Sequence, residues 1–125
     1  MAAGDKENHF DCVVSFSSLE HSGLGRYGDP LDPWGDLRTM ARLQCVTKPN
    51  AAFFIGFPYG DEAICWNAHR IYGPKRSAHM FANIKITESS MPEYVDKANH
   101  NQGKISHRKI CRGEEQPMFF GRKYV

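Results

Sequence analysis

Two short runs of β-branched and aromatic residues, separated by one helix-length segment, constrain the fold of this chain most strongly. Residues 10–17 and 51–57 have the length and composition of strands. Between them, apolar residues recur at helical spacing from residue 35 or 36 to residue 48, and Pro49 ends that pattern. A strand, a helix and a second strand in this order normally form a right-handed crossover between parallel strands. The sequence therefore predicts an α/β fold whose parallel strands are buried on both faces.

The rest of the chain has weaker periodicity. Pro74 to Met80 predicts a short helix with proline in its first turn, and residues 83–87 predict a strand. Residues 63–66 fit either a short strand or the start of a helix. We expect one small domain of 125 residues, divided into a polar lead-in (1–9), an α/β half-domain (10–87), a polar and partly disordered segment (88–116) and a terminal antiparallel strand (117–125).

Composition excludes several classes of protein. The net charge of +2 is too small to indicate a nucleic-acid partner, and the basic residues between 104 and 112 lack aromatic stacking partners. No apolar run approaches the length of a membrane span, and the polar N-terminus is not a signal peptide. No histidine or cysteine spacing matches a zinc framework, so we expect no metal. The four cysteines form no C-x-x-C pair, which predicts reduced thiols in a cytoplasmic or nuclear protein.

Residues 23–28 spell Gly-Leu-Gly-Arg-Tyr-Gly, a literal G-x-G-x-x-G. In dinucleotide-binding proteins this pattern forms a tight turn that opens a helix. Here Pro30 and Pro33 follow, so no helix can begin before about residue 34. The pattern therefore predicts a glycine-rich surface loop, and a nicotinamide-dependent enzyme is a poor hypothesis.

Polar side chains follow both predicted strands. Glu20 and His21 come after the first strand, where ligands bind in open α/β sheets. These two residues suit either acid–base catalysis or hydrogen bonds that hold the long loop in place. After the second strand, residues 66–74 contain Asn67, His69 and Arg70. These residues suit recognition of a polar or anionic ligand, or they belong to a surface turn with its aromatic residues buried.

Three parts of the sequence resemble known families. Residues 10–15, followed by Glu20 and His21, resemble the F-D-x-V-x-S fourth strand and E-H pair of class I S-adenosylmethionine-dependent methyltransferases. Residues 40–51 are similar to the helix and L-K-P-G-G turn that enter the fifth strand of those enzymes. Residues 20–30 and 67–74 together resemble the family catalogued as domain of unknown function 268, whose members are methyltransferase-like by sequence.

The resemblance implies an incomplete Rossmann-like methyltransferase sheet, from its fourth strand onward. It implies transfer of a methyl group from S-adenosylmethionine, in a full-length form, to a small or polar acceptor. Glu20 and His21 would be catalytic, by orienting or deprotonating the acceptor. The other implied site residues are Ser15, Ser17 and Ser18 beside the cofactor, and Arg26, Tyr27, Asn67, His69 and Arg70 around the substrate.

The sequence departs from the methyltransferase pattern in two places. Asn50 and Ala51 replace two glycines, a small change because asparagine tolerates the turn. More importantly, only nine polar residues precede the first strand, in place of the strands and glycine-rich turn that hold the cofactor. We therefore expect a truncated protein, weakly active or inactive alone, that binds no cofactor by itself. Its first strand would lie at an exposed sheet edge, open to self-association or a partner subunit. A non-catalytic binding or scaffold protein that associates through that edge is the alternative.

Overall fold

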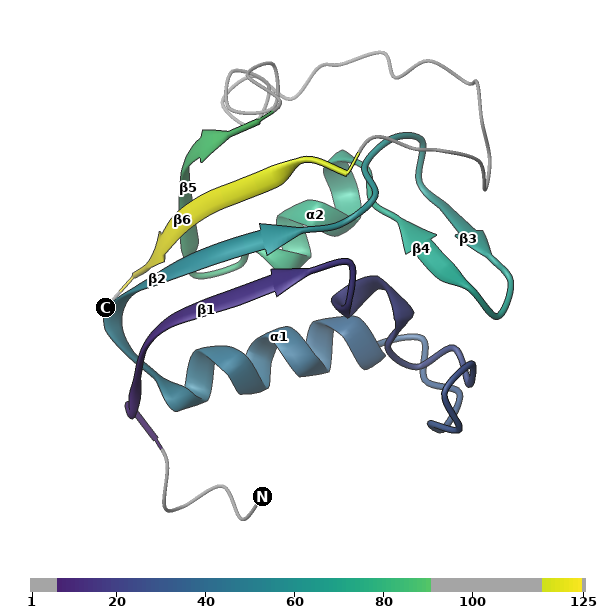
Figure 1. Cartoon of the computed structure of the whole chain (residues 1–125), viewed down its shortest axis with the longest axis horizontal. Coiled ribbons are helices and arrows are strands. Elements are labelled where there is room, and N and C mark those ends of the chain that lie inside the picture. Colours follow the sequence, from purple (N-terminus) through teal and green to yellow (C-terminus); the bar gives the residue numbers. More distant parts are fainter. Residues whose placement is uncertain (1–6, 91–115, 125) are drawn as a thin grey trace.

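A computed structural model describes residues 7–90 and 116–124 of the chain (Figure 1). It contains a four-stranded sheet, a separate two-stranded hairpin and two α-helices. In chain order the elements are β1 (Phe10–Phe16), the 3-10 helix η2 (Leu19–His21), α1 (Gly35–Val46), β2 (Thr47–Gly56), β3 (Ala63–Cys65), β4 (His69–Ile71), α2 (Pro74–Met80), β5 (Ile84–Ser89) and β6 (Met118–Lys123).

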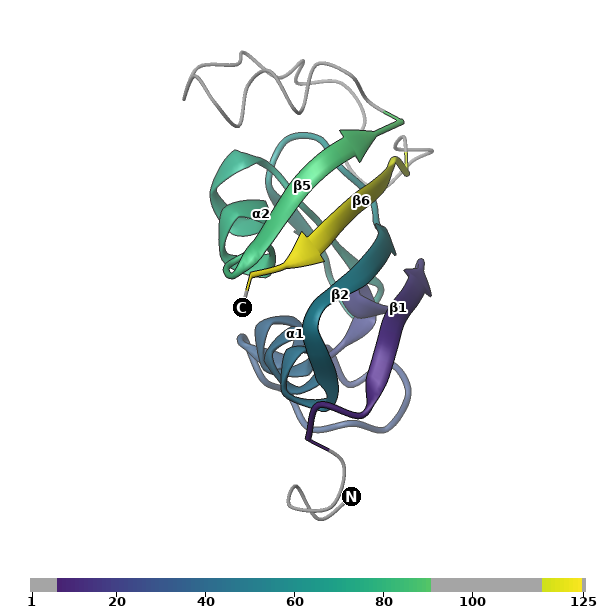
Figure 2. The ribbon, with the colours of Figure 1, turned by 90° about the vertical axis from the view of Figure 1, so that its left-hand side faces the viewer.

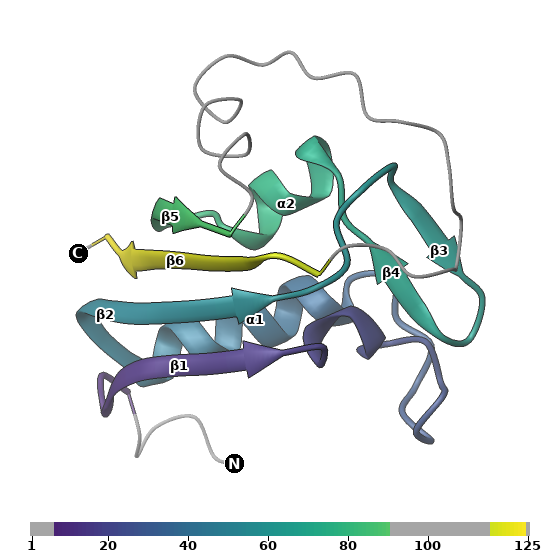
Figure 3. The ribbon, with the colours of Figure 1, turned by 45° about the horizontal axis from the view of Figure 1, so that its top comes forward.

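The sheet has the order β1–β2–β6–β5. β1 and β2 are parallel, with α1 between them in the chain, as the sequence predicted. β6 is antiparallel to both of its neighbours, which confirms the predicted antiparallel terminal strand. The β3–β4 hairpin projects beyond the carboxyl ends of β1 and β2 (Figures 1 and 3). The described residues therefore form a mixed α/β sheet with a hairpin at the carboxyl end of its parallel strands.

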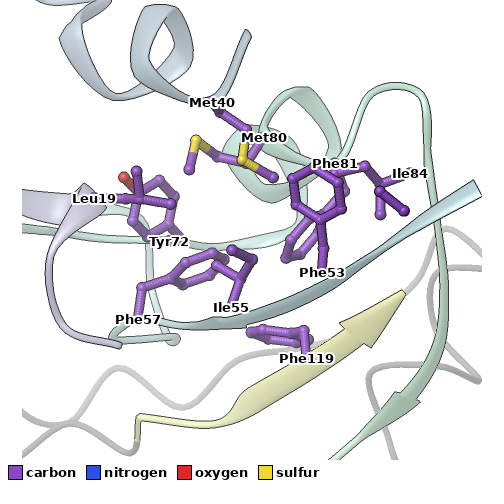
Figure 4. Packing of buried hydrophobic residues seen from close by; sticks show 11 residues of the cluster. Leu19, Met40, Phe53, Ile55, Phe57, Tyr72, Met80, Phe81, Ile84 and Phe119 are labelled. Carbon is purple, nitrogen blue, oxygen red and sulfur yellow. The ribbon is translucent and has the colours of Figure 1, made fainter. Parts of the chain in front are cut away.

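Both helices pack on the same face of the sheet (Figure 2). The core lies between them and β2, whose alternate residues Phe53 and Ile55 are almost completely buried, as is Phe57 directly after the strand (Figure 4). The Phe57 ring contacts Tyr72, with ring centroids 4.2 Å apart, and Phe119, at 5.2 Å. Each such side chain contributes roughly 1.5–3 kcal/mol by leaving water. This packing fixes the position of the carboxyl end of β2, from which the chain continues to the hairpin.

The other face of the sheet carries no helix among the described residues (Figure 2). The prediction that β1 is buried on both faces is therefore wrong. Val14 is 71% exposed and Phe16 is 57% exposed, because their side chains point to this bare face. β1 is also the terminal strand in the sheet order, as expected for a strand at a sheet edge.

The boundary between α1 and β2 differs from the prediction. The helix ends at Val46, two residues earlier than expected, and the Thr47 hydroxyl donates a hydrogen bond to the Gln44 carbonyl at 3.0 Å. β2 then includes Pro49 and Asn50 as an irregularity, where the pairing with β1 shifts register. Asn50 adopts the left-handed conformation expected for it, with φ of 62°. The regular pairing resumes at Ala52, close to the predicted strand start.

The later elements largely match the sequence pattern. α2 has the predicted bounds, with Pro74 in its first turn, and residues 63–65 form a strand rather than a helix. β5 extends to Ser89, so it includes the first two residues of the predicted polar segment. Residues 91–115 lie outside the described residues, as does the basic stretch within them.

The state of the cysteines differs in part from the prediction. Cys12 and Cys45 are free, but Cys65 is disulfide-bonded, so the prediction of four reduced thiols is wrong for Cys65. Cys111 lies outside the described residues.

Within residues 7–90 and 116–124, no helix is long and apolar enough to span a membrane. The same residues hold no group of three or more potential metal ligands.

Candidate functional site

The chain leaves β1 through a sharp turn at the carboxyl end of the sheet. Ser17 has a φ of 51°, and its N–H donates to the Gly56 carbonyl at 2.9 Å, so the turn is anchored to the end of β2. η2 follows directly and places Glu20 and His21 beside the β3–β4 hairpin. Ligands bind at such strand ends in open α/β sheets.

Glu20 is the most unusual residue of this site. Its side chain is completely buried, yet neither carboxylate oxygen has a hydrogen-bond partner among the described residues. His21 is the nearest side chain that can carry a positive charge, with 3.6 Å between its Nε2 atom and Glu20 Oε1. Burying a carboxylate without hydrogen bonds costs free energy. Glu20 is thus costly for stability alone, and such groups call for a functional explanation.

The contacts of His21 show which of its ring nitrogens carries a proton. Its Nδ1 atom lies 2.5 Å from the carbonyl oxygen of Ala68, in the turn of the hairpin. Because a carbonyl only accepts hydrogen bonds, Nδ1 carries a proton and donates it there. This leaves Nε2 facing Glu20 at 3.6 Å, somewhat beyond hydrogen-bond reach. The two atoms are placed to exchange a proton after a small movement, as an acid–base pair requires.

Two further predicted residues surround His21. Tyr27 lies edge-on to the His21 ring, with centroids 5.7 Å apart, and His69 does so at 6.2 Å. The Arg26 guanidinium lies 5.9 Å from the centre of the Tyr27 ring. Tyr27 is largely exposed, so the cluster opens to solvent on this side. We call Glu20, His21, Tyr27 and His69 the Glu20–His21 cluster.

The remaining predicted residues lie around this cluster rather than in it. Ser15 is on β1, near its carboxyl end, whereas Ser17 lies in the turn that follows and Ser18 precedes η2. Asn67 is exposed at the tip of the hairpin, with a φ of 57°. Their assignment to cofactor or substrate stays a prediction.

Arg70 is placed differently from the other predicted substrate residues. Its side chain is buried, and its guanidinium donates hydrogen bonds to the carbonyl oxygens of Ser22 and Asp32. Its Nε atom lies 3.7 Å from Asp36 Oδ2. These contacts tie the hairpin to both ends of the glycine-rich loop. The placement favours a structural role for Arg70, and its role toward a substrate stays a prediction.

The G-x-G-x-x-G segment forms a compact loop and opens no helix. Gly23 has a φ of 80°, and a Cβ there would lie 2.2 Å from the Asp32 carbonyl oxygen, so only glycine fits. Its N–H donates to Asp29 Oδ2 at 2.6 Å, and this hydrogen bond holds the pKa of Asp29 below its ordinary value. α1 begins only at Gly35. The loop therefore lacks the geometry of a dinucleotide fingerprint.

A buried ionic cluster at the start of α1 was not predicted. Asp36 is completely buried and accepts hydrogen bonds from Tyr72 Oη at 2.7 Å, Arg76 Nε at 2.9 Å and Arg76 Nη2 at 2.6 Å. Burial raises the pKa of Asp36, but these hydrogen bonds and the charges of Arg70 and Arg76 outweigh it and hold that pKa below its ordinary value. Burial, together with Asp36, raises the pKa of Tyr72. The sequence predicted a helix start at residue 35 or 36, but no local pattern indicated partners for Asp36 that lie 36 and 40 residues further along the chain.

A solved structure supports the class of this fold. The chain is similar to the 1,6-didemethyltoxoflavin-N1-methyltransferase of Burkholderia thailandensis, crystallised with 1,6-didemethyltoxoflavin and S-adenosylhomocysteine, with a TM-score of 0.59 and 16% sequence identity. The likeness covers 97% of this chain and 47% of that protein, so the chain spans about half the length of its neighbour. The fold is thus an incomplete Rossmann-like α/β sheet.

The family follows from the sequence match. The family described as "Caenorhabditis protein of unknown function, DUF268" matches residues 3–119, which is most of the chain. The chain belongs to this family. No curated protein matches it significantly.

Proposed function

We propose that this chain is the acceptor-binding half of a methyltransferase-like protein, with the Glu20–His21 cluster contacting the methyl acceptor. The observation that carries the proposal is the completely buried carboxylate of Glu20, which lacks hydrogen bonds at the carboxyl end of β1. An acceptor hydroxyl or amine that reaches Glu20 would supply the missing hydrogen bond.

The residues around the strand end fit one side of an S-adenosylmethionine site. Ser17 and Ser18 offer hydroxyl groups where β1 ends, and Glu20 offers a carboxylate. When bound, the cofactor supplies an electrophilic methyl group, which passes to the acceptor by in-line displacement. The chain's part is to hold the acceptor in line and to take up the proton that the acceptor loses. We assign the proton to the Glu20–His21 pair, because His21 Nδ1 is fixed on the Ala68 carbonyl and only Nε2 faces Glu20.

The test needs the chain together with a cofactor-binding half, either in a longer form of the protein or in a partner chain that co-purifies with it. Calorimetric titration of that protein with S-adenosylmethionine and S-adenosylhomocysteine is expected to show saturable binding. The 125-residue chain alone is expected to show none. Glu20→Gln should lower methyl transfer without changing cofactor affinity, whereas Glu88→Gln, at an exposed position of β5, should change neither. A folded protein that carries both halves and binds neither compound would overturn the proposal.

The bare face of the sheet favours a second function, a non-catalytic scaffold that associates through β1. Besides Val14 and Phe16, this face includes a hollow of about 460 Å³ lined by Phe54, Met118 and Phe120, among others. Exposed apolar side chains on a strand at the sheet edge are typical of an interaction surface.

Molar mass in solution distinguishes the two functions. A scaffold would form a defined assembly without cofactor affinity, measured by light scattering after size exclusion. Val14→Lys should dissociate that assembly, whereas Thr87→Lys, at an exposed position of β5, should leave it intact. A monomeric chain whose mass is the same before and after Val14→Lys would contradict the scaffold function.

A further inference from the structure

A second hollow lies on the helix-covered side of the hairpin. It has a volume of about 360 Å³ and lies between the start of α1, the β3–β4 hairpin and α2. Ligand pockets commonly have volumes of roughly 300–1,000 Å³, so this one suits a small molecule. The lining residues that matter here are Trp34, Leu37, Ile64, Lys75, Arg76 and His79, and we call this site the Trp34 hollow.

Apolar side chains from separate elements converge on the Trp34 hollow. Trp34 precedes α1 and is 56% exposed, and Ile64 on β3 is 58% exposed. Leu37 continues the apolar surface toward the core against which it packs. Single exposed apolar residues are ordinary, but large ones that line the same concave surface are typical of a binding site.

The charges around the hollow leave an excess of positive charge. Arg70 and Arg76 face the buried carboxylate of Asp36, and Glu62 accepts a hydrogen bond from the backbone N–H of Arg76 at 2.7 Å. These two cations and two anions balance. Lys75 and His79 lie one turn apart on α2 and form no ion pair within the described part of the chain. A ligand that carries one negative charge would complement them.

The aromatic wall of the hollow is held in place before any ligand arrives. The Arg76 guanidinium lies 6.0 Å from the centre of the Trp34 ring. That guanidinium is itself fixed by Asp36 and by the Pro33 carbonyl oxygen, at 2.6 Å. A pre-positioned ring lowers the entropy lost on binding.

We propose that the Trp34 hollow binds a small aromatic molecule that carries a single negative charge, such as an aromatic carboxylate. The ring of the ligand lies against Trp34 and Ile64, and its carboxylate faces Lys75 and His79. This site is distinct from the Glu20–His21 cluster, although Arg70 borders the hollow and ties down the loop after Glu20. The proposal therefore holds whether or not the protein transfers methyl groups.

The test uses Trp34 as its own reporter. The chain has two tryptophans, so Trp66→Phe leaves the indole N–H of Trp34 as the single signal of its kind in a proton–nitrogen NMR spectrum. The probes are biphenyl-4-carboxylate and the neutral biphenyl-4-carboxamide, which has nearly the same shape. We expect a saturable shift of the Trp34 signal with the carboxylate, and an affinity about two- to fivefold lower for the carboxamide, as for other exposed charge pairs.

A pair of matched variants isolates the charge. Lys75→Gln should lower the affinity for the carboxylate by the same factor and leave the carboxamide unaffected. Lys85→Gln makes the same change at an exposed position of β5 and should alter neither affinity. Equal affinities for the two probes, no saturable shift at Trp34, or equal effects of the two lysine variants would overturn the proposal. So would a carboxylate that perturbs Val14 and Phe54 on the bare face instead of Trp34.

Discussion

Two completely buried carboxylates lie close together in the sequence but have opposite surroundings. Asp36 accepts three hydrogen bonds, from Tyr72 and Arg76, and lies 3.7 Å from Arg70. Glu20 has no hydrogen bond to either oxygen among the described residues, and only His21 Nε2 within 4 Å as an ionic partner. Both are at the carboxyl end of the sheet, one at the start of α1 and one in η2. The difference separates a carboxylate that protein groups already bind from one for which we propose a ligand.

The contacts of Asp36 explain why its burial is tolerated. Its carboxylate joins α1 to residues of the hairpin segment and of α2, and it compensates the buried guanidinium of Arg70. A buried ion pair adds little compared with apolar packing, but removing one partner leaves an uncompensated charge. Glu20 makes no comparable link, so its loss should leave the fold intact.

The largest effect that we predict is that of Asp36→Ala. The variant leaves Arg70 buried without its carboxylate, and the free energy of unfolding should fall by about 3–5 kcal/mol. Urea denaturation measures this loss. The control is Asp11→Ala, which breaks the exposed ion pair between Asp11 and Lys48 and should cost at most about 1 kcal/mol. Equal losses for the two variants would contradict the structural role of Asp36.

Lowering the pH should reduce the free energy of unfolding through protonation of Asp36. The pKa of Asp36 is lower in the folded chain than its ordinary value, so its contribution is complete above that ordinary value, about 3.9. The contribution is lost as the pH falls from there through the folded pKa, because the unfolded state binds the proton more readily. Stability measured from pH 5 downward should therefore fall less steeply in Asp36→Asn than in the original chain. Parallel pH profiles would show that other carboxylates control acid unfolding.

Tyr72→Phe tests one contact of Asp36 with a smaller change. The variant removes the hydroxyl that donates to Asp36 Oδ2 and keeps the ring that packs on Phe57. Since Arg76 still binds the carboxylate, the loss should be about 1 kcal/mol. Tyr124→Phe, at an exposed position, should have no effect in the same denaturation assay. A loss close to that of Asp36→Ala would mean that Tyr72 rather than Arg76 holds the carboxylate.

The sequence predicted the elements of the fold better than their arrangement. β1, α1, β2, α2 and β6 follow from local periodicity, proline positions and β-branched residues. The insertion of β6 between β2 and β5 follows from no local pattern, because strand order depends on contacts between residues far apart in the chain. The exposure of Val14 was missed for the same reason: an apolar run has the same composition whether or not a helix covers it.

The candidate site was predictable to a similar degree. Glu20, Tyr27 and His69 all lie close to His21, and their roles toward an acceptor stay predictions. Arg70 has a residue type that suits a ligand site, yet its guanidinium pairs with Asp36 and donates hydrogen bonds to the loop backbone. Residue type shows what a side chain is able to bind, and only the fold shows whether a protein group already occupies it.

Glu20→Gln is the smallest predicted change and the sharpest test of the comparison. Glutamine keeps the shape of the side chain and removes a charge that lacks hydrogen bonds in the described structure. The variant should be as stable as the original chain or more stable by up to about 1 kcal/mol, because the cost of burying that charge disappears and only the attraction of His21 at 3.6 Å is lost. Urea denaturation beside Asp36→Asn, which makes the same chemical change at the other carboxylate and should be destabilising, gives the comparison directly. A Glu20→Gln loss as large as that of Asp36→Asn would make Glu20 a structural residue, and it would remove the observation on which the proposed acceptor site depends.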